Sequence, residues 1–322
     1  MNRKREVPPR LEQPPALDDP DAVVEIHEQA GAILNLDEAA VPGFVQLSLQ
    51  EHHRLLSTHS GLVRKDAPES AVTVVYLPGL PKVCVKEIRW RGVGYGLKSL
   101  FRATQGQRTY RNGRRLNDAG FPAASPLALV RRKRMGLVRA EWILMEVIPG
   151  AMELDRYLVH RIDRQWTAEE KRGMTRLLGR FVGSMHAGGI FHSDLKTCNI
   201  VVSEDDPSPE DITDSGHWRP LNPCRSVRFS LLDYDDVTFS GDVTFRKRVK
   251  NLAQIFLSMP SAISGGDRLR FLNEYALHAG LNGAQKRQMA RHVLRLVRGK
   301  DILYVGFDGD IIEKWDVGDS ES

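Results

Sequence analysis

Apolar and polar residues follow two different periods along the chain. Between Phe44 and Glu87, and again between Pro126 and Glu146, short apolar runs alternate with polar and turn residues, as in β-strands. After residue 148 the apolar spacing becomes helical. It predicts helices over Met152–His160, Thr167–Met185, Arg246–Met259, Asp267–Ala279 and Gly283–Arg298. This change of period predicts an α+β fold with a small antiparallel N-terminal lobe and a mainly helical C-terminal lobe.

The first segments and the boundary between the lobes complete this division. Residues 1–40 are rich in proline and are predicted to be a largely disordered tail, with room for one short helix over Ala22–Leu36. The N-lobe is assigned to residues 41–147 and the C-lobe to residues 148–322. Within the N-lobe, the pattern predicts a strand–turn–strand over Leu55–Val63 and a helix over Gln105–Asp118.

Composition restricts the class of protein. The 322 residues are 41% hydrophobic and 27% charged, and 46 Lys and Arg against 41 Asp and Glu give a net charge of +5, which favours anionic partners. Three cysteines are too few for a disulfide framework, and a reducing cytoplasm fits them best. No signal peptide or apolar run long enough to span a bilayer is expected, so any work at a membrane would be done from its surface.

One stretch carries the spacing of a kinase catalytic loop. Phe191–Val202 contains His-x-Asp, a lysine two residues beyond Asp194 and an asparagine five residues beyond it, followed by a β-branched run. Asp194 can accept the proton of an attacking hydroxyl, Lys196 can reach the γ-phosphate, and the Asn199 oxygen can ligate Mg²⁺. A solvated turn before a strand is the alternative interpretation.

A second acidic segment supports this interpretation. Val227–Leu232 is predicted to be a buried strand, and it delivers Asp233 at its carboxyl end, where a second Mg²⁺ ligand is required. The two segments are separated by a polar, proline-rich insertion over residues 203–226.

The nucleotide site is predicted from the N-lobe strands. Strand alternation places Cys84 and Lys86 on one face, so that Lys86 can hold the phosphates of ATP and Cys84 can lie against adenine. Ser60 and Gly61 belong to a turn whose backbone N–H groups could contact a phosphate, although an ordinary hairpin turn explains them equally well. Glu146 begins the connector between the lobes, where backbone groups would bond adenine.

One feature of the N-lobe differs from the pattern of a protein kinase, and the role of a second feature has two interpretations. The helix that should supply a glutamate to pair with Lys86 contains none, because Asp118 is the only acid between Ile88 and Ala140. Another acid, the nucleotide or a polar residue such as Gln107 must orient Lys86. The basic run Arg131–Arg134 is interpreted as a loop that is either solvated or in contact with an anion, on the substrate or on an acidic membrane surface.

Together the motifs around Lys86, Asp194 and Asp233 resemble those of the bacterial lipopolysaccharide kinase family, the Kdo and heptose kinases of the protein-kinase-like superfamily. The basic helix followed by Gly120-Phe121-Pro122 supports this resemblance, as does the Asn251–Gln254 segment. It implies a bilobal kinase-like fold and phosphorylation of a sugar hydroxyl on a lipid A–core intermediate, with ATP and Mg²⁺, at the cytoplasmic face of the inner membrane.

Two other functions are compatible with the sequence. An atypical bacterial protein kinase would use the same catalytic residues on a protein acceptor. A pseudokinase scaffold would explain the missing helix glutamate, although the joint presence of Lys86, Asp194, Asn199 and Asp233 counts against it. Nucleic acid is not an expected partner, because the basic helix lacks interleaved aromatic residues and a known binding motif.

Overall fold

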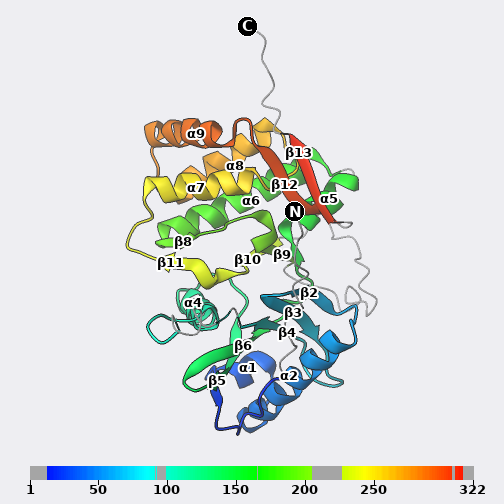
Figure 1. Ribbon diagram of the computed structural model, residues 1–322. Helices are drawn as coiled ribbons and strands as arrows, with labels where there is room; N and C mark the ends of the chain where they lie inside the picture. Colours follow the sequence, from blue (N-terminus) through cyan, green and yellow to red (C-terminus); the bar gives the residue numbers. More distant parts are fainter. Residues whose placement is uncertain are drawn as a thin grey trace, which may run out of the picture. The chain divides into compact units, whose positions relative to one another are not determined.

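The computed structural model describes residues 13–90, 92, 99–164, 166–204, 227–306 and 309–314. These residues form two compact units (Figure 1). The first, here called the sheet unit, comprises residues up to Gly120 and Ala124–Val147; the second, the helical unit, comprises Phe121–Ala123 and the chain from Ile148 onward. The chain enters the second unit briefly at Phe121–Ala123, returns to the first at Ala124, and passes to the second again between Val147 and Ile148.

The sheet unit is built on one antiparallel sheet of six strands in the order β1-β5-β6-β4-β3-β2. Its strands are β1 (Ala22–Ile26), β2 (Val63–Ala67), β3 (Ser70–Val75), β4 (Val83–Ile88), β5 (Pro126–Arg134) and β6 (Leu137–Glu146). Its helices are α1 (Ala30–Leu34), the 3-10 turn η1 (Glu38–Ala40), α2 (Val41–Ser57) and α4 (Gln105–Asp118).

Helices cover both faces of this sheet (Figure 1). On one face, α1 and α2 contribute Leu34, Phe44 and Leu49 to a core that includes Val85 and Trp142. On the other face, Tyr110 of α4 packs against Ile88 and Ile143. Helix α4 has the bounds predicted for it, and a capping box between Thr104 and Gln107 fixes its start.

Two predictions for the first sixty residues are wrong. Ala22–Ile26 is a strand paired with β5, not part of a helix, and only Ala30–Leu34 is helical. Residues 41–57 form helix α2, where strands were predicted. Their buried side chains recur every three or four residues, at Val41, Phe44, Val45, Ser48, Leu49 and His52, which is the spacing of a helix lying on a sheet.

The basic run 131–134 was predicted to be a loop and instead belongs to strand β5. The turn comes immediately afterwards, at Met135 and Gly136, which both adopt positive φ angles of 52° and 76°. Two successive positive φ values are characteristic of the tight turns that join twisted antiparallel strands. The strand therefore continues through the charged residues up to the turn.

The helical unit contains five longer helices and several short strands among its described residues. The helices are α5 (Leu154–Asp163), α6 (Ala168–Ala187), α7 (Phe245–Phe256), α8 (Gly265–His278) and α9 (Gly283–Val297). The strands are β7 (Met152–Glu153), β8 (Ile190–His192), β9 (Ile200–Glu204), β10 (Val227–Leu231), β11 (Val237–Phe239), β12 (Asp301–Gly306) and β13 (Gly309–Lys314). The predicted helices of the second half are confirmed, whereas the β12–β13 hairpin was not anticipated.

Helices α6 and α8 pack closely because α6 carries glycine where they meet. A Cβ added at Gly179 would lie 2.5 Å from the carbonyl oxygen of Phe271, and one added at Gly183 would lie 2.8 Å from that of Tyr275. This approach brings His186, at the end of α6, against Tyr275. Among the described residues, no helix has both the length and the apolar character needed to cross a bilayer.

Candidate active site

Two strand pairings in the helical unit bring the predicted catalytic loop and the predicted metal-binding segment together. Strand β8 pairs with β11 through His192 and Val237, and β9 pairs with β10 through Ile200 and Leu231. The segments 193–199 and 232–236 connect these strands, so both leave the paired region at the same place. They are joined directly, because the Leu232 N–H donates to the Asn199 carbonyl at 2.9 Å.

Asp194 is held by two neighbours and remains half-exposed. Its Oδ1 accepts a hydrogen bond from the Gln254 amide at 3.2 Å, and its Oδ2 lies 3.2 Å from Nζ of Lys196. The side chains of Asp194 and Lys196 are 50% and 47% exposed. A fixed but accessible carboxylate beside an ammonium group can accept a proton while the cation meets an anionic substrate group.

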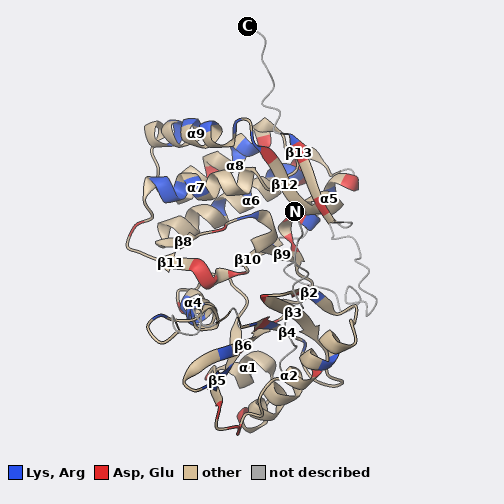
Figure 2. Ribbon diagram, viewed as in Figure 1, with Lys and Arg blue, Asp and Glu red and all other residues tan. Residues whose placement is uncertain are grey.

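Asn199 and Asp233 present oxygen atoms on the two joined segments. The Asn199 amide nitrogen, in the short 3-10 turn η2 (Thr197–Asn199), donates to the Asp194 carbonyl at 2.8 Å, and its amide oxygen is an acceptor 3.9 Å from the Cys198 Sγ. Asp233 has a φ of 49° and begins the 3-10 turn η4 (Tyr234–Asp236), whose acidic segment after β10 is red in Figure 2.

This donor set fits a hard divalent cation. Mg²⁺ prefers oxygen ligands and is commonly held by one or two protein groups together with substrate phosphates. In the part of the chain that the structure describes, no cluster of three or more His, Cys, Asp or Glu forms a closed metal site. The carboxylate of Asp233 and the amide oxygen of Asn199 are therefore the residues that would hold such an ion, with phosphate oxygens completing its shell.

His192 fixes the geometry between these two segments. Its Nδ1 accepts from the Asp194 N–H at 3.2 Å, and its Nε2 donates to the Leu232 carbonyl at 3.0 Å. Only the neutral tautomer with the proton on Nε2 satisfies both bonds. Burial lowers the pKa of His192, which keeps this tautomer at neutral pH.

A buried polar network beneath the loop was not predicted from the sequence. Asn251 of α7 donates to the His192 carbonyl at 2.6 Å and to the side chain of Gln254 at 2.9 Å, and it accepts from His186 at 3.0 Å. His186 in turn accepts from the Tyr275 hydroxyl at 2.9 Å. Burial lowers the pKa of His186 to about 4, so the network is neutral above that pH.

Gln254 of this network and Ser258, just beyond the end of α7, also hold the loop. Gln254 donates to the Ser193 carbonyl at 3.0 Å, and the Thr197 hydroxyl donates to the Ser258 carbonyl at 2.6 Å. The sequence contained one signal for this support. Asn251 and Gln254 are the two uncharged polar residues of α7, whose other polar residues are Lys or Arg, and their spacing of three places both on one face.

The sheet unit carries the other predicted site residues. Lys86 and Cys84 project from the same face of β4, with Val72 and Val74 of β3 as their respective partners. Burial raises the pKa of the Cys84 thiol to about 11. At the end of β6, the Glu146 carboxylate accepts from both the N–H and the hydroxyl of Ser125, at 2.8 and 2.9 Å.

Ser60 and Gly61 do not occupy the hairpin on which their predicted role rested. They follow helix α2 and lead into β2, next to the end of β3 that carries Val74, because the Val74 N–H donates to the Leu62 carbonyl. The tight turn of this part of the sheet joins β2 to β3 between Ala67 and Ser70. A phosphate contact at Ser60 and Gly61 therefore stays a prediction, and the hairpin turn on which that prediction was based is absent at these two residues.

Comparison with known proteins places the chain in a family. The family model for the lipopolysaccharide kinases (Kdo/WaaP) matches residues 95–275, which is more than half of the chain. The chain belongs to the lipopolysaccharide kinase (Kdo/WaaP) family. The resemblance to this family inferred from the sequence is thus confirmed. The described residues also have the expected α+β composition, with an antiparallel sheet in one unit and mainly helices in the other.

The matching relatives share 24% and 30% sequence identity with this chain. The lipopolysaccharide core heptose(I) kinase WaaP of Pseudomonas aeruginosa is 24% identical over 192 residues, covering 58% of this chain and 66% of that protein. The EKC/KEOPS complex subunit bud32 of Emericella nidulans is 30% identical over 111 residues, covering 30% of this chain and 38% of that protein. The matched part therefore spans less than two thirds of either relative.

Among solved structures, WaaP in complex with acyl carrier protein is similar with a TM-score of 0.48 and 19% identity. The match covers 84% of this chain and 99% of that chain.

Proposed function

We propose that this protein is an ATP-dependent kinase that transfers the γ-phosphoryl group to a sugar hydroxyl of a lipopolysaccharide inner-core intermediate. The observation that carries the proposal is the joined pair of segments presenting Asp194, Lys196, Asn199 and Asp233, in a chain that belongs to the lipopolysaccharide kinase family. The side-chain geometry alone would suit phosphoryl transfer to any hydroxyl group. Family membership is what supports a glycolipid as the acceptor.

Each residue has a proposed task. Asp194 accepts the proton of the attacking sugar hydroxyl, and Lys196 neutralises charge on the transferring phosphoryl group. Asn199 and Asp233 hold Mg²⁺, which when bound neutralises the phosphates of ATP. In the sheet unit, Lys86 binds the α- and β-phosphates.

Cys84 and the backbone at Glu146 complete the proposed nucleotide site by contacting adenine. Catalysis then consists mainly of positioning and charge neutralisation.

The deciding experiment measures phosphate on a glycolipid. The wild-type chain and the Asp194→Ala variant are incubated with Mg-ATP and purified lipid A–core glycolipids, and the products are weighed by mass spectrometry. We expect a gain of one phosphate with the wild type alone. Labelling of a generic protein substrate by γ-labelled ATP, with unchanged glycolipid, would instead identify an atypical protein kinase. Function that survives Asp194→Ala in cells would identify a scaffold.

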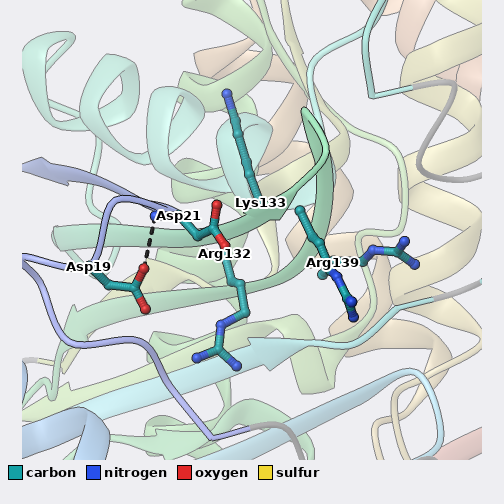
Figure 3. A pocket seen from close by; sticks show the side chains of 6 residues that line it. Asp19, Asp21, Arg132, Lys133 and Arg139 are labelled. Carbon is teal, nitrogen blue, oxygen red and sulfur yellow. Dashed lines mark hydrogen bonds between the residues drawn. The ribbon is translucent and has the colours of Figure 1, made fainter.

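A basic pocket in the sheet unit supports work at an acidic membrane surface (Figure 3). The cavity, of about 450 Å³, lies at the β5–β6 hairpin and the segment before β1. It is lined by Asp19, Asp21, Arg132, Lys133, Arg134 and Arg139. Four cationic side chains outnumber two carboxylates, one of which, Asp19, already accepts from the Asp21 N–H at 2.8 Å. We propose that this pocket binds the phosphate of an anionic lipid headgroup at the cytoplasmic face of the inner membrane.

Vesicle binding tests the membrane contact. Neutralising Arg132, Lys133 and Arg134 to glutamine should weaken binding to anionic phospholipid vesicles on the order of a hundredfold, at roughly 1 kcal/mol per charge, and leave neutral vesicles unaffected. The matched control removes three exposed charges from α9, at Arg287, Arg291 and Arg295. Loss of binding in the α9 variant alone would move the contact away from the hairpin.

A further inference from the structure

A buried carboxylate marks the start of helix α4. Glu141 of β6 is 1% exposed. The Thr104 hydroxyl donates to its Oε1, and the Gly106 N–H donates to its Oε2 at 3.1 Å. The carboxylate thus caps the N-terminus of α4, where the helix dipole favours a negative charge. Both donors are neutral, and a buried carboxylate is strongly disfavoured unless a cation also lies nearby.

Strand register places Glu141 on the same face of the sheet as Lys86. Glu141 is the partner of Ile88, and Lys86 is the partner of Ile143, so the two charged residues occupy diagonal positions on neighbouring strands. Such positions are roughly 7–8 Å apart, a separation that long side chains can bridge. Ile88 and Ile143 pack against Tyr110, so α4 covers this face.

Helix α4 has no buried acidic side chain of its own, and its Gly106 leaves space for the carboxylate of Glu141. The buried residues of this fully described helix are Gly106, Thr109, Tyr110, Gly113 and Leu116, and none is acidic. A Cβ added at Gly106 would lie 2.7 Å from the Glu141 Oε1. The absence of a side chain at this helix position is therefore what admits the carboxylate from the strand.

The neighbouring cations on β5 and β6 have partners of their own. Arg131 lies directly opposite Glu141 on β5, but its guanidinium donates to Glu25 at 2.7 Å. Arg139, two residues before Glu141 on β6, lies over the ring of Trp90, 4.1 Å from its centroid. On the neighbouring strand β4, Lys86 is the cation whose register matches Glu141.

We propose that Glu141 is the positioning residue that orients Lys86, replacing from a β-strand the glutamate that helix α4 lacks. This inference rests on the proposed role of Lys86 as the phosphate-binding lysine. Because the same carboxylate caps α4, docking of the helix and orientation of the lysine are coupled through one side chain. Glu141 itself touches neither substrate nor nucleotide in this proposal.

The test measures the reactivity of Lys86, which does not require catalysis. The intact chain is treated at fixed pH with a limiting amine-acylating reagent, and the extent of Lys86 modification is read by peptide mass spectrometry. In Glu141→Gln, the remaining carbonyl oxygen can still accept from Gly106, so the cap is retained while the charge is lost. We expect Lys86 to react on the order of threefold to tenfold faster, because its amine is no longer held in a charge-assisted hydrogen bond to the carboxylate.

Glu87→Gln is the matched control. Glu87 is equally buried, at 1% exposure, and neighbours Lys86 in sequence, but it points to the opposite face, where it lies 3.4 Å from His52 of α2. Its loss should leave the reactivity of Lys86 unchanged. Equal Lys86 labelling in wild type, Glu141→Gln and Glu87→Gln would overturn the proposal.

A second variant acts without removing the charge. Gly106→Ala forces the carboxylate to shift, and it should increase the labelling of Lys86 in the same direction but by less. If Glu141→Gln fails to fold, this variant decides the matter, and unchanged labelling in it contradicts the pairing.

Kinetics of phosphoryl transfer distinguish a failure of the Glu141–Lys86 pairing from a failure of the proposed function. In Glu141→Gln, kcat for phosphoryl transfer should fall roughly tenfold or more, with a smaller change in KM for ATP, because a misdirected lysine mainly affects transition-state charge. A wild-type chain that transfers no phosphate would refute the proposed function, whereas the labelling result would still report on the Glu141–Lys86 pair. Normal transfer with unchanged labelling would refute the pair alone.

Discussion

The two units hold their functional side chains by different means. In the helical unit, Asp194 and Asn199 lie on a loop that is held by the amide of Gln254 in α7 and by the hydroxyl of Ser258, just beyond the end of that helix. In the sheet unit, Lys86 and Cys84 are placed by strand register, between two partner strands on β4. The loop therefore depends on a few buried polar residues, whereas the strand depends on packing over both faces of a sheet. Substitutions in the two units should therefore differ in how they change catalysis and the free energy of unfolding.

The largest effect is expected at Asp194. Asp194→Ala should lower kcat for transfer on the order of a thousandfold, the range for removal of a general base. Its side chain is half-exposed, so the free energy of unfolding should change by less than about 1 kcal/mol. Steady-state kinetics and chemical denaturation measure the two quantities. Asp242→Ala is the control: it removes an exposed carboxylate of the same unit, which pairs with the buried Arg248, and should leave kcat unchanged. A comparable loss of kcat in both variants would contradict a role specific to Asp194.

Asn251 tests whether the loop really depends on the buried network. Asn251→Ala removes the side chain that donates to the His192 carbonyl and that accepts from His186 Nε2 in a buried site, so we expect the free energy of unfolding to fall by about 3 kcal/mol. Chemical denaturation checks this value. The matched control is Asn273→Ala, an exposed residue of α8 whose side chain accepts from Lys286, and it should change stability by less than about 0.5 kcal/mol. Equal stability of the two variants would mean that the network contributes little.

This contrast also explains which features were predictable from the sequence. The site residues of the helical unit lie within one loop or directly after one strand, so their spacing alone identified Asp194, Asn199 and Asp233 as candidates. Glu141 was not identified, because its relation to Lys86 exists only through the pairing of two strands more than fifty residues apart. Periodicity predicted α4 and the later helices but missed α2, whose polar residues Gln46, Gln50 and Glu51 among apolar ones resembled alternating strands.

Acidification should weaken the helical unit through His186. Burial lowers the pKa of His186 from 6.5 to about 4, so the folded state resists a proton that the unfolded chain accepts. Stability from this group is complete above pH 6.5 and is lost as the pH falls from 6.5 toward 4, by up to about 3 kcal/mol. Denaturation of the wild type between pH 7 and 4.5 should show this slope, and His186→Gln should flatten it. An identical slope in the variant would assign the acid sensitivity to other groups.

The smallest effect concerns Cys84, which reports on the nucleotide side of the sheet unit. Burial raises the pKa of its thiol to about 11, so only about 1% is thiolate at pH 9 and alkylation is slow. If adenine lies against this face of β4, Mg-ATP should slow the alkylation of Cys84 several-fold at pH 9, with each cysteine followed separately by mass spectrometry. Because the two rates are compared at one pH, a slower reaction with Mg-ATP indicates reduced access to the thiol, and equal rates with and without nucleotide would remove Cys84 from the proposed adenine site.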